Sequence, residues 1–206
     1  MIDRCEALVL GIGNVLWADE GFGVRAVEAL HAKYAFPDAV SLQDGGTQGL
    51  YLFGAIAAAR RVLVFDAIDF GLAPGALRVL RDGEVPAWMP QKMSPHQTGL
   101  NDVLALAQLR GEAPEAITLI GVQPEELSDL GGSLRERVKA RVAEAVELAA
   151  AELGAWGYPA RLRDAGAVVA PLNAVALALD RYENGRPSSD EACRVGDARV
   201  LSRTRM

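Results

Sequence analysis

The sequence predicts an α/β protein, a three-layer sandwich in which helices cover both faces of a five-stranded, mostly parallel twisted sheet with one antiparallel strand. Two observations predict this fold class. Short apolar runs typical of buried strands alternate along the chain with longer segments of helical periodicity, as in βαβ units. The chain has 206 residues, of which 50% are hydrophobic and 23% are charged, so it is long enough to bury one substantial core.

Three short runs predict the first parallel strands: residues 7–10 and 62–65 are apolar, and residues 40–43 form the second strand between them. Each run is followed directly by a glycine or an aspartate, which marks the end of the strand. Residues 22–34 carry apolar side chains three or four positions apart, and residues 50–59 are similarly apolar. These two segments are the expected crossover helices between the strands.

The second half of the domain begins with a change of pattern after Asp66. Gly71, Pro74 and Gly75 leave room only for a short turn before residues 76–80, so this fourth strand is expected to be antiparallel. A helix follows, with Thr98 as its N-cap and with one apolar stripe formed by Leu100, Val103, Leu104 and Ala107. A fifth strand at 117–122 and a long helix over 134–149 complete the domain.

The composition loosens after residue 154, where glycine and proline become frequent. We therefore divide the chain into an α/β domain, residues 1–154, and a C-terminal extension, residues 155–206. The extension is expected to hold one helix over 172–182 and to be partly disordered at its end.

Charge and cysteine content exclude several functional classes. The formal net charge of −6 lacks the concentrated positive field that nucleic acid requires. Cys5 and Cys193 stand far apart in no CxxC spacing, as expected for free thiols in a reducing compartment. The amino terminus lacks a signal-peptide layout, and the longest apolar stretch, 165–179, is interrupted and too short to span a bilayer. We expect a cytoplasmic protein without membrane insertion.

The loop after the first strand, Gly11-Ile12-Gly13, invites comparison with dinucleotide-binding loops. Leu16 stands where the third glycine of that pattern belongs, and Asp44 precedes two more glycines rather than a ribose-binding context. The simpler interpretation is that Gly11 and Gly13 permit a tight turn, which does not exclude a different ligand.

Glu20, Asp66 and His96 are the candidate metal ligands, because all three fall in loops that the proposed topology places at the same end of the sheet. One imidazole and two carboxylates suit zinc or nickel and leave coordination positions open. Taken singly, two of them have an ordinary explanation: a carboxylate of Asp19-Glu20 favours the helix dipole by about 0.3–1 kcal/mol, and His96 is a loop histidine. Asp66 is harder to explain in this way, because it directly ends four consecutive apolar residues at the carboxyl end of a strand. The other histidine, His31, is assigned no role.

Asp44, at the end of the neighbouring strand, has two interpretations. In the first, Asp44 orients a ligand or binds substrate. In the second, it is a turn-forming aspartate before Gly45-Gly46.

Together these residues resemble the endopeptidases that mature the large subunit of nickel-iron hydrogenases. The resemblance covers about residues 7–153, and four motifs occur in the family's order. They are Gly11-Ile12-Gly13-Asn14 with Asp19-Glu20-Gly21-Phe22-Gly23-Val24, Asp44-Gly45-Gly46-Thr47, Asp66-Ala67 and Ser94-Pro95-His96-Gln97. The extension is similar to that of a longer branch serving membrane-linked uptake hydrogenases.

The resemblance implies a cytoplasmic peptidase that removes a C-terminal peptide from the hydrogenase large-subunit precursor after nickel insertion. It implies that Glu20, Asp66 and His96 contact the metal, and that the metal is the precursor's nickel rather than a stored cofactor, although zinc or cadmium can occupy the site in vitro. The family has been grouped with aspartyl-type proteases, which makes Asp66 or Glu20 the candidate base. The segment Asp44-Gly45-Gly46-Thr47 is the candidate substrate-binding element. The expected partner is the nickel-loaded precursor.

Two alternatives stay open. The first is a hydrolase of small amides or peptides that carries its own zinc at the same three residues. The second is a non-catalytic maturation chaperone or nucleotide-binding module. No Ser-His-Asp or Cys-His pattern is visible in the sequence, so the nucleophile is not assigned.

Overall fold

The structure of the protein is a computed structural model that describes residues 5–85 and 95–186, without the side chains of residues 95–98. The described residues up to Asn173 form one compact unit, and those from Ala174 onward belong to a second. The predicted division at residue 154 stays a prediction, and the predicted disordered end and Cys193 lie outside the described residues.

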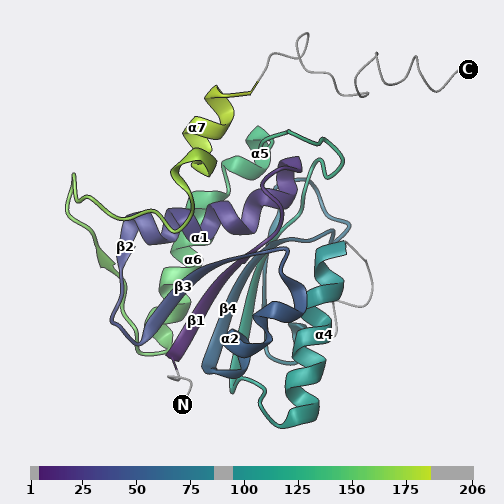
Figure 1. Ribbon diagram of the computed structural model, residues 1–206, viewed down its shortest axis with the longest axis vertical. Coiled ribbons are helices and arrows are strands. Elements are labelled where there is room, and N and C mark those ends of the chain that lie inside the picture. The colour runs from purple at the N-terminus through teal and green to yellow at the C-terminus, as the bar shows by residue number, and fades with distance from the viewer. Residues whose placement is uncertain (1–4, 86–94, 187–206) are drawn as a thin grey trace, which may run out of the picture. The chain divides into compact units, whose positions relative to one another are not determined.

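A five-stranded sheet runs through the first unit in the order β3-β1-β4-β6-β5 (Figure 1). The strands are β1 (Cys5–Ile12), β3 (Val40–Gly46), β4 (Ala59–Ala67), β5 (Leu77–Arg81) and β6 (Ala116–Val122). The four strands β3, β1, β4 and β6 are parallel, and β5 pairs antiparallel with β6 at the edge. The predicted sheet, including its one antiparallel strand, is therefore confirmed.

Helices cover both faces of this sheet, so the three-layer prediction is confirmed as well. On one side, here called the α1 face, lie α1 (Phe22–Lys33), α5 (Glu136–Lys139) and α6 (Val142–Ala155). On the other, here called the α4 face, lie the 3-10 helix η2 (Gly49–Leu52), α2 (Phe53–Ala57) and α4 (Pro95–Arg110).

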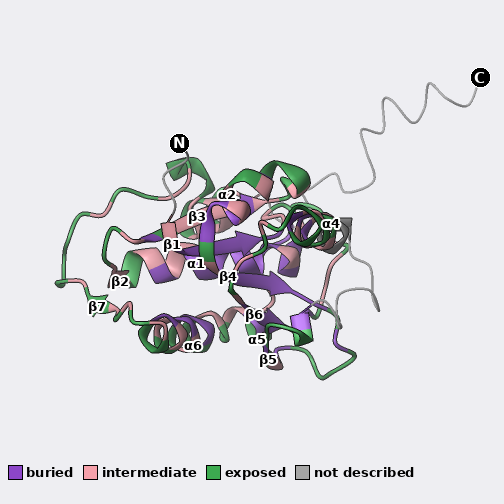
Figure 2. Ribbon diagram, turned by 90° about the horizontal axis from the view of Figure 1, so that it is seen from below, coloured by how far each residue is buried: buried purple, intermediate pink, exposed green. Residues whose placement is uncertain are grey.

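Strand residues alternate between the two cores, as the pleat of a strand requires. Ala7 and Val9 of β1 pack on the α1 face, whereas Leu8 and Leu10 pack on the α4 face. Figure 2 shows the central strands buried between the two helical layers. Burial on both faces explains why these strands read as continuous apolar runs.

Three predicted helices differ from the observed ones. The helix predicted over 50–59 is wrong in its form, because η2 and the short α2 replace it and β4 already begins at Ala59, paired with Cys5. The long closing helix is divided into α5 and α6, since the N–H of Arg141 bonds the carbonyl of Val138 only three residues back and tightens the chain there.

The helix predicted over 172–182 is also divided. The structure has a 3-10 helix η4 (Val175–Leu177) and a helix α7 (Leu179–Asn184), separated by the non-helical backbone of Ala178. Both elements belong to the second unit.

A two-stranded antiparallel sheet, β2 (Tyr34–Ala35) with β7 (Arg161–Leu162), was not predicted. It joins residues that follow the closing helix to the end of α1, and Asn173 Nδ2 adds a 2.7 Å hydrogen bond to Glu28 Oε1. Among the described residues no helix is long and apolar enough to cross a bilayer. The thiol of Cys5 is free.

Candidate active site at the carboxyl end of the sheet

The loop between β1 and α1 folds back tightly on the end of the sheet. Gly13 has φ 133°, and a Cβ at this position would lie 1.8 Å from the carbonyl oxygen of Glu20. A Cβ at Gly23 would lie 2.2 Å from the carbonyl oxygens of both Ile12 and Phe65, so the first turn of α1 rests on the ends of β1 and β4. Close backbone packing thus accounts for these glycines and brings Glu20 to the end of β4.

Asp66 is the penultimate residue of β4 and is only 3% exposed. Its Oδ1 accepts a 2.8 Å hydrogen bond from the N–H of Ala67, but its buried Oδ2 has no hydrogen-bond partner within the described part of the chain. Burial raises the pKa of the Asp66 carboxyl well above its ordinary value, and the nearby Glu20 carboxylate raises it further. The Glu20 carboxylate therefore lies within electrostatic range of Asp66.

His96 lies in the first turn of α4, which begins at Pro95. The predictions of a loop position for His96 and an N-cap role for Thr98 are wrong, because the helix starts three residues earlier, with proline in the first turn where it is well tolerated. The side chain of His96 is not described. The side chains that are described include no group of three or more potential metal ligands, and the set of Glu20, Asp66 and His96 stays a prediction.

Asp44 does not join this pair. Leu42 packs on the α1 face, so Asp44, two residues later in β3, faces the same side, whereas Asp66 follows Phe65 of that face and points to the other. Asp44 Oδ1 accepts a 2.7 Å hydrogen bond from the N–H of Gly46, as a turn-forming aspartate does. Burial raises the pKa of Asp44, and its role in substrate binding stays a prediction.

Asp19 is the functional neighbour that the sequence did not reveal. It is fully buried, and Oδ2 accepts hydrogen bonds from the N–H groups of Glu125 and Glu126 at 2.8 and 2.9 Å, while Oδ1 accepts one from Arg135 at 2.7 Å. Asp19 thus anchors the loop after β6 to the 3-10 helix η1 (Ala18–Gly21) that carries Glu20. Its partners lie more than 100 residues away, so no local sequence signal pointed to them.

Gln123 was also missed, because its partners lie 51 to 54 residues away in the sequence. Its Oε1 accepts hydrogen bonds from the N–H groups of Phe70 at 2.8 Å and Leu72 at 3.1 Å, and its Nε2 donates to Asp69 Oδ1 at 3.1 Å. The amide therefore holds the loop that leaves β4 directly after Asp66.

Two carboxyl groups within electrostatic range of each other define the chemistry of this site, and one of them is buried with an oxygen that has no partner among the described residues. A buried carboxylate is costly unless a cation or a proton neutralises it. The donor set therefore fits a divalent cation, or a carboxyl group that takes up and releases a proton. In an open α/β sheet this edge is also where ligands bind.

The fold and the two carboxyl groups place the protein in the class of three-layer α/β proteins, in which ligands bind at the carboxyl end of the sheet. Comparison with known proteins identifies the family within this class. The hydrogenase maturation protease family matches residues 24–152. The hydrogenase expression/formation protein HoxM of Cupriavidus necator is 54% identical over 200 residues, covering 94% of this chain and 97% of that protein. HupD of Rhodobacter capsulatus is 55% identical over 197 residues, covering 95% and 93%.

A solved structure agrees with these matches. The hydrogenase maturating endopeptidase HybD of Escherichia coli superposes with a TM-score of 0.74 at 45% identity and covers 77% of this chain and 98% of its own. The chain belongs to the hydrogenase maturation protease family and is a peptidase.

Proposed function

We propose that this protein is the endopeptidase that removes the C-terminal peptide from the large-subunit precursor of a nickel-iron hydrogenase, in the cytoplasm and only after nickel insertion. Family membership supports the reaction and the precursor as substrate. The observation that carries the metal dependence is the buried Oδ2 of Asp66, which has no partner among the described residues and lies near the Glu20 carboxylate.

In this proposal Glu20, Asp66 and His96 contact nickel that the precursor brings. A cation offsets the repulsion between the two carboxylates and the cost of burying Asp66. Three protein ligands leave coordination positions open, which thiolates of the precursor fill. Docking then depends on whether the metal has been loaded.

The bond is cut by water in this scheme. Nickel supplies Lewis-acid chemistry, by polarising the scissile carbonyl or lowering the pKa of the water. Asp66 or Glu20 accepts the proton of the water, which accounts for an aspartyl-type grouping. Within the described residues the only histidine side chain, His31, bonds the carbonyl of Ala170 at 2.9 Å and forms no catalytic pair with a nucleophile.

The test compares nickel-free and nickel-loaded precursors incubated with the purified protein, with loss of the C-terminal peptide followed by mass spectrometry. Cleavage of the loaded precursor alone is expected. Equal cleavage of both would refute nickel gating, and cleavage of neither would refute this substrate.

Ligand variants refine the result. His96→Ala and Asp66→Asn should abolish processing and keep the fold, whereas His31→Ala, the same change in the other histidine, should process normally. Metal analysis of protein purified without added metal addresses the zinc alternative. One tightly held zinc per chain would favour a hydrolase with its own metal.

A further inference from the structure

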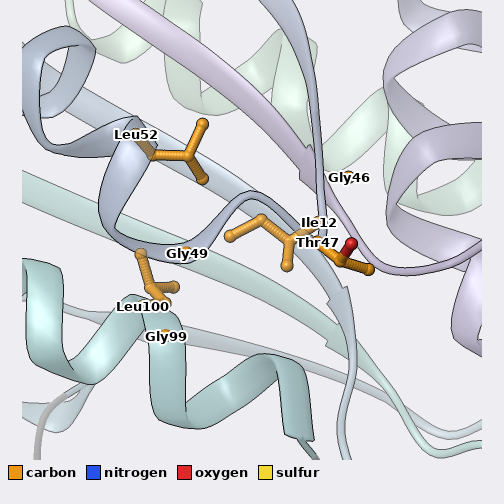
Figure 3. Close-up of a pocket in the computed structure, with 7 residues that line it drawn as sticks. All are labelled: Ile12, Gly46, Thr47, Gly49, Leu52, Gly99 and Leu100. Atoms are coloured by element: carbon orange, nitrogen blue, oxygen red, sulfur yellow. The ribbon is translucent and has the colours of Figure 1, made fainter.

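We propose that a small apolar cavity beside Asp66 is the subsite for an aliphatic side chain of the substrate residue next to the cleaved bond. The inference rests on the proposed function and deepens it. The cavity has a volume of about 40 Å³. Its walls are the side chains of Ile12, Thr47, Leu52 and Leu100 and the backbones of Gly49 and Gly99 (Figure 3).

Strand register places the cavity next to the carboxyl pair. Gly11 pairs with Phe65, so the next residues, Ile12 and Asp66, are neighbours at the ends of β1 and β4. Both point to the α4 face, since Leu10 and Val64, two residues earlier, pack in the core of that face. A side chain that enters the cavity past Ile12 therefore leaves its own backbone beside the Asp66 carboxyl.

The helical wall of the cavity comes from the turn that follows position 96. Leu100 lies four residues after His96 on α4, so the two positions share one side of the helix. The cavity is thus flanked by Asp66 on the sheet and by the candidate ligand position on the helix. A substrate bond near the metal would lie at its mouth.

Two glycines set the width of the cavity. A Cβ at Gly99 would lie 2.9 Å from the Cα of Gly49, so α4 and η2 touch through their backbones at this point. The close approach keeps Leu52 and Leu100 on opposite walls instead of filling the space between them (Figure 3). Thr47 is exposed and opens the cavity toward solvent.

Size and lining determine the ligand class. The volume is about three times the 10–15 Å³ that a single water needs. Most of the lining is apolar, and the polar groups at its edge come from Thr47 and the glycine backbones, so a branched side chain of about three carbon atoms, such as valine, suits the space better than water. Each buried CH₂ group should raise kcat/KM about fourfold, and a charged side chain should be rejected.

The experiment uses the full chain and nickel-loaded precursors in which the residue on either side of the cleaved bond is changed in turn to alanine, valine or phenylalanine. At one of the two positions the wild-type protein should prefer valine over alanine by about tenfold and over phenylalanine by more. Leu100→Ala enlarges the cavity and should raise the phenylalanine-to-valine ratio of kcat/KM at that position at least tenfold.

Thr47→Phe narrows the exposed mouth without touching the core and should shift the preference toward alanine. The matched control is Leu104→Ala, which makes the same change one turn further along α4 at a partly buried residue that does not line the cavity. It should leave all three ratios unchanged.

Unaltered ratios in both Leu100→Ala and Thr47→Phe would overturn the subsite, as would equal changes in Leu100→Ala and Leu104→Ala, or no preference at either substrate position. Should Leu100→Ala fail to fold, the ratios of Thr47→Phe decide. If the wild-type protein cleaves no precursor, the proposed function fails instead.

Discussion

Asp19 and Glu20 are adjacent carboxylates for which replacement by alanine should have different effects. Asp19 is fully buried and accepts three backbone N–H groups from Glu125, Glu126 and Arg135 at 2.7 to 2.9 Å. Asp19→Ala removes the two acceptor oxygens of all three hydrogen bonds and leaves the loop after β6 without its anchor. The variant should therefore lose stability.

The size of the loss follows from these contacts. A hydrogen bond to a charged group contributes about 1.5–3 kcal/mol, and part of that is recovered when water reaches the freed N–H groups. We expect Asp19→Ala to lower the free energy of unfolding by about 3–5 kcal/mol. At about 2–4 °C per kcal/mol for a chain of this size, Tm should fall by about 6–20 °C.

Glu20→Ala is the matched control. Glu20 is only half-buried and its charge disfavours the ionised form of Asp66, so its removal should change the free energy of unfolding by less than about 1 kcal/mol. Processing of the nickel-loaded precursor should nevertheless be lost, because Glu20 is a proposed metal ligand.

Urea unfolding followed by circular dichroism gives both free energies, and calorimetry gives Tm. A loss below about 1 kcal/mol in Asp19→Ala would refute the anchoring role of its hydrogen bonds. Equal destabilisation by the two variants would contradict the structural role of Asp19 and the metal-binding role of Glu20.

Three further variants test other parts of the structure. Asp66→Asn should raise the free energy of unfolding by about 1 kcal/mol while abolishing processing, because a neutral amide is less costly to bury than a carboxylate; a less stable variant in calorimetry would contradict this. The hydrogen bond from Arg81 lowers the pKa of Glu152, so their pair stabilises the fold above the ordinary glutamate pKa, and this contribution disappears as the pH falls through the lowered folded-state value. Because Arg81 is 55% exposed, Glu152→Gln should lower the free energy of unfolding by only about 0.5–1 kcal/mol at pH 7 and should not change it in strong acid. A loss that does not change with pH in urea titrations would disprove the stabilising role of the Arg81–Glu152 ion pair. Gly54→Ala should stabilise α2 by about 0.5–1 kcal/mol, since a Cβ there meets nothing within 4 Å, and an unchanged or lower Tm would count against it.

The pattern of apolar residues was sufficient to predict the sheet. The runs at 7–10 and 62–65 are wholly apolar and the run at 117–122 holds a single polar residue, Thr118, as expected for strands that are covered on both sides. The short turn after Asp66 left no room for a crossover helix, and that fixed the antiparallel direction of β5. The same topology predicted that Glu20 lies within electrostatic range of Asp66, since the ends of parallel strands share one edge.

Which groups meet across that edge depends on the packing of the layers and could not be predicted from the sequence. Asp19 accepts hydrogen bonds from residues more than 100 positions away in the sequence. Asp44 faces the α1 side of the sheet, although its motif lies between those of Glu20 and Asp66 in the sequence. The cavity likewise combines Ile12 with residues from η2 and α4. Periodicity shows which face of a helix or strand is buried. The contacts between elements depend on how the layers pack against each other, and the local sequence does not encode that packing.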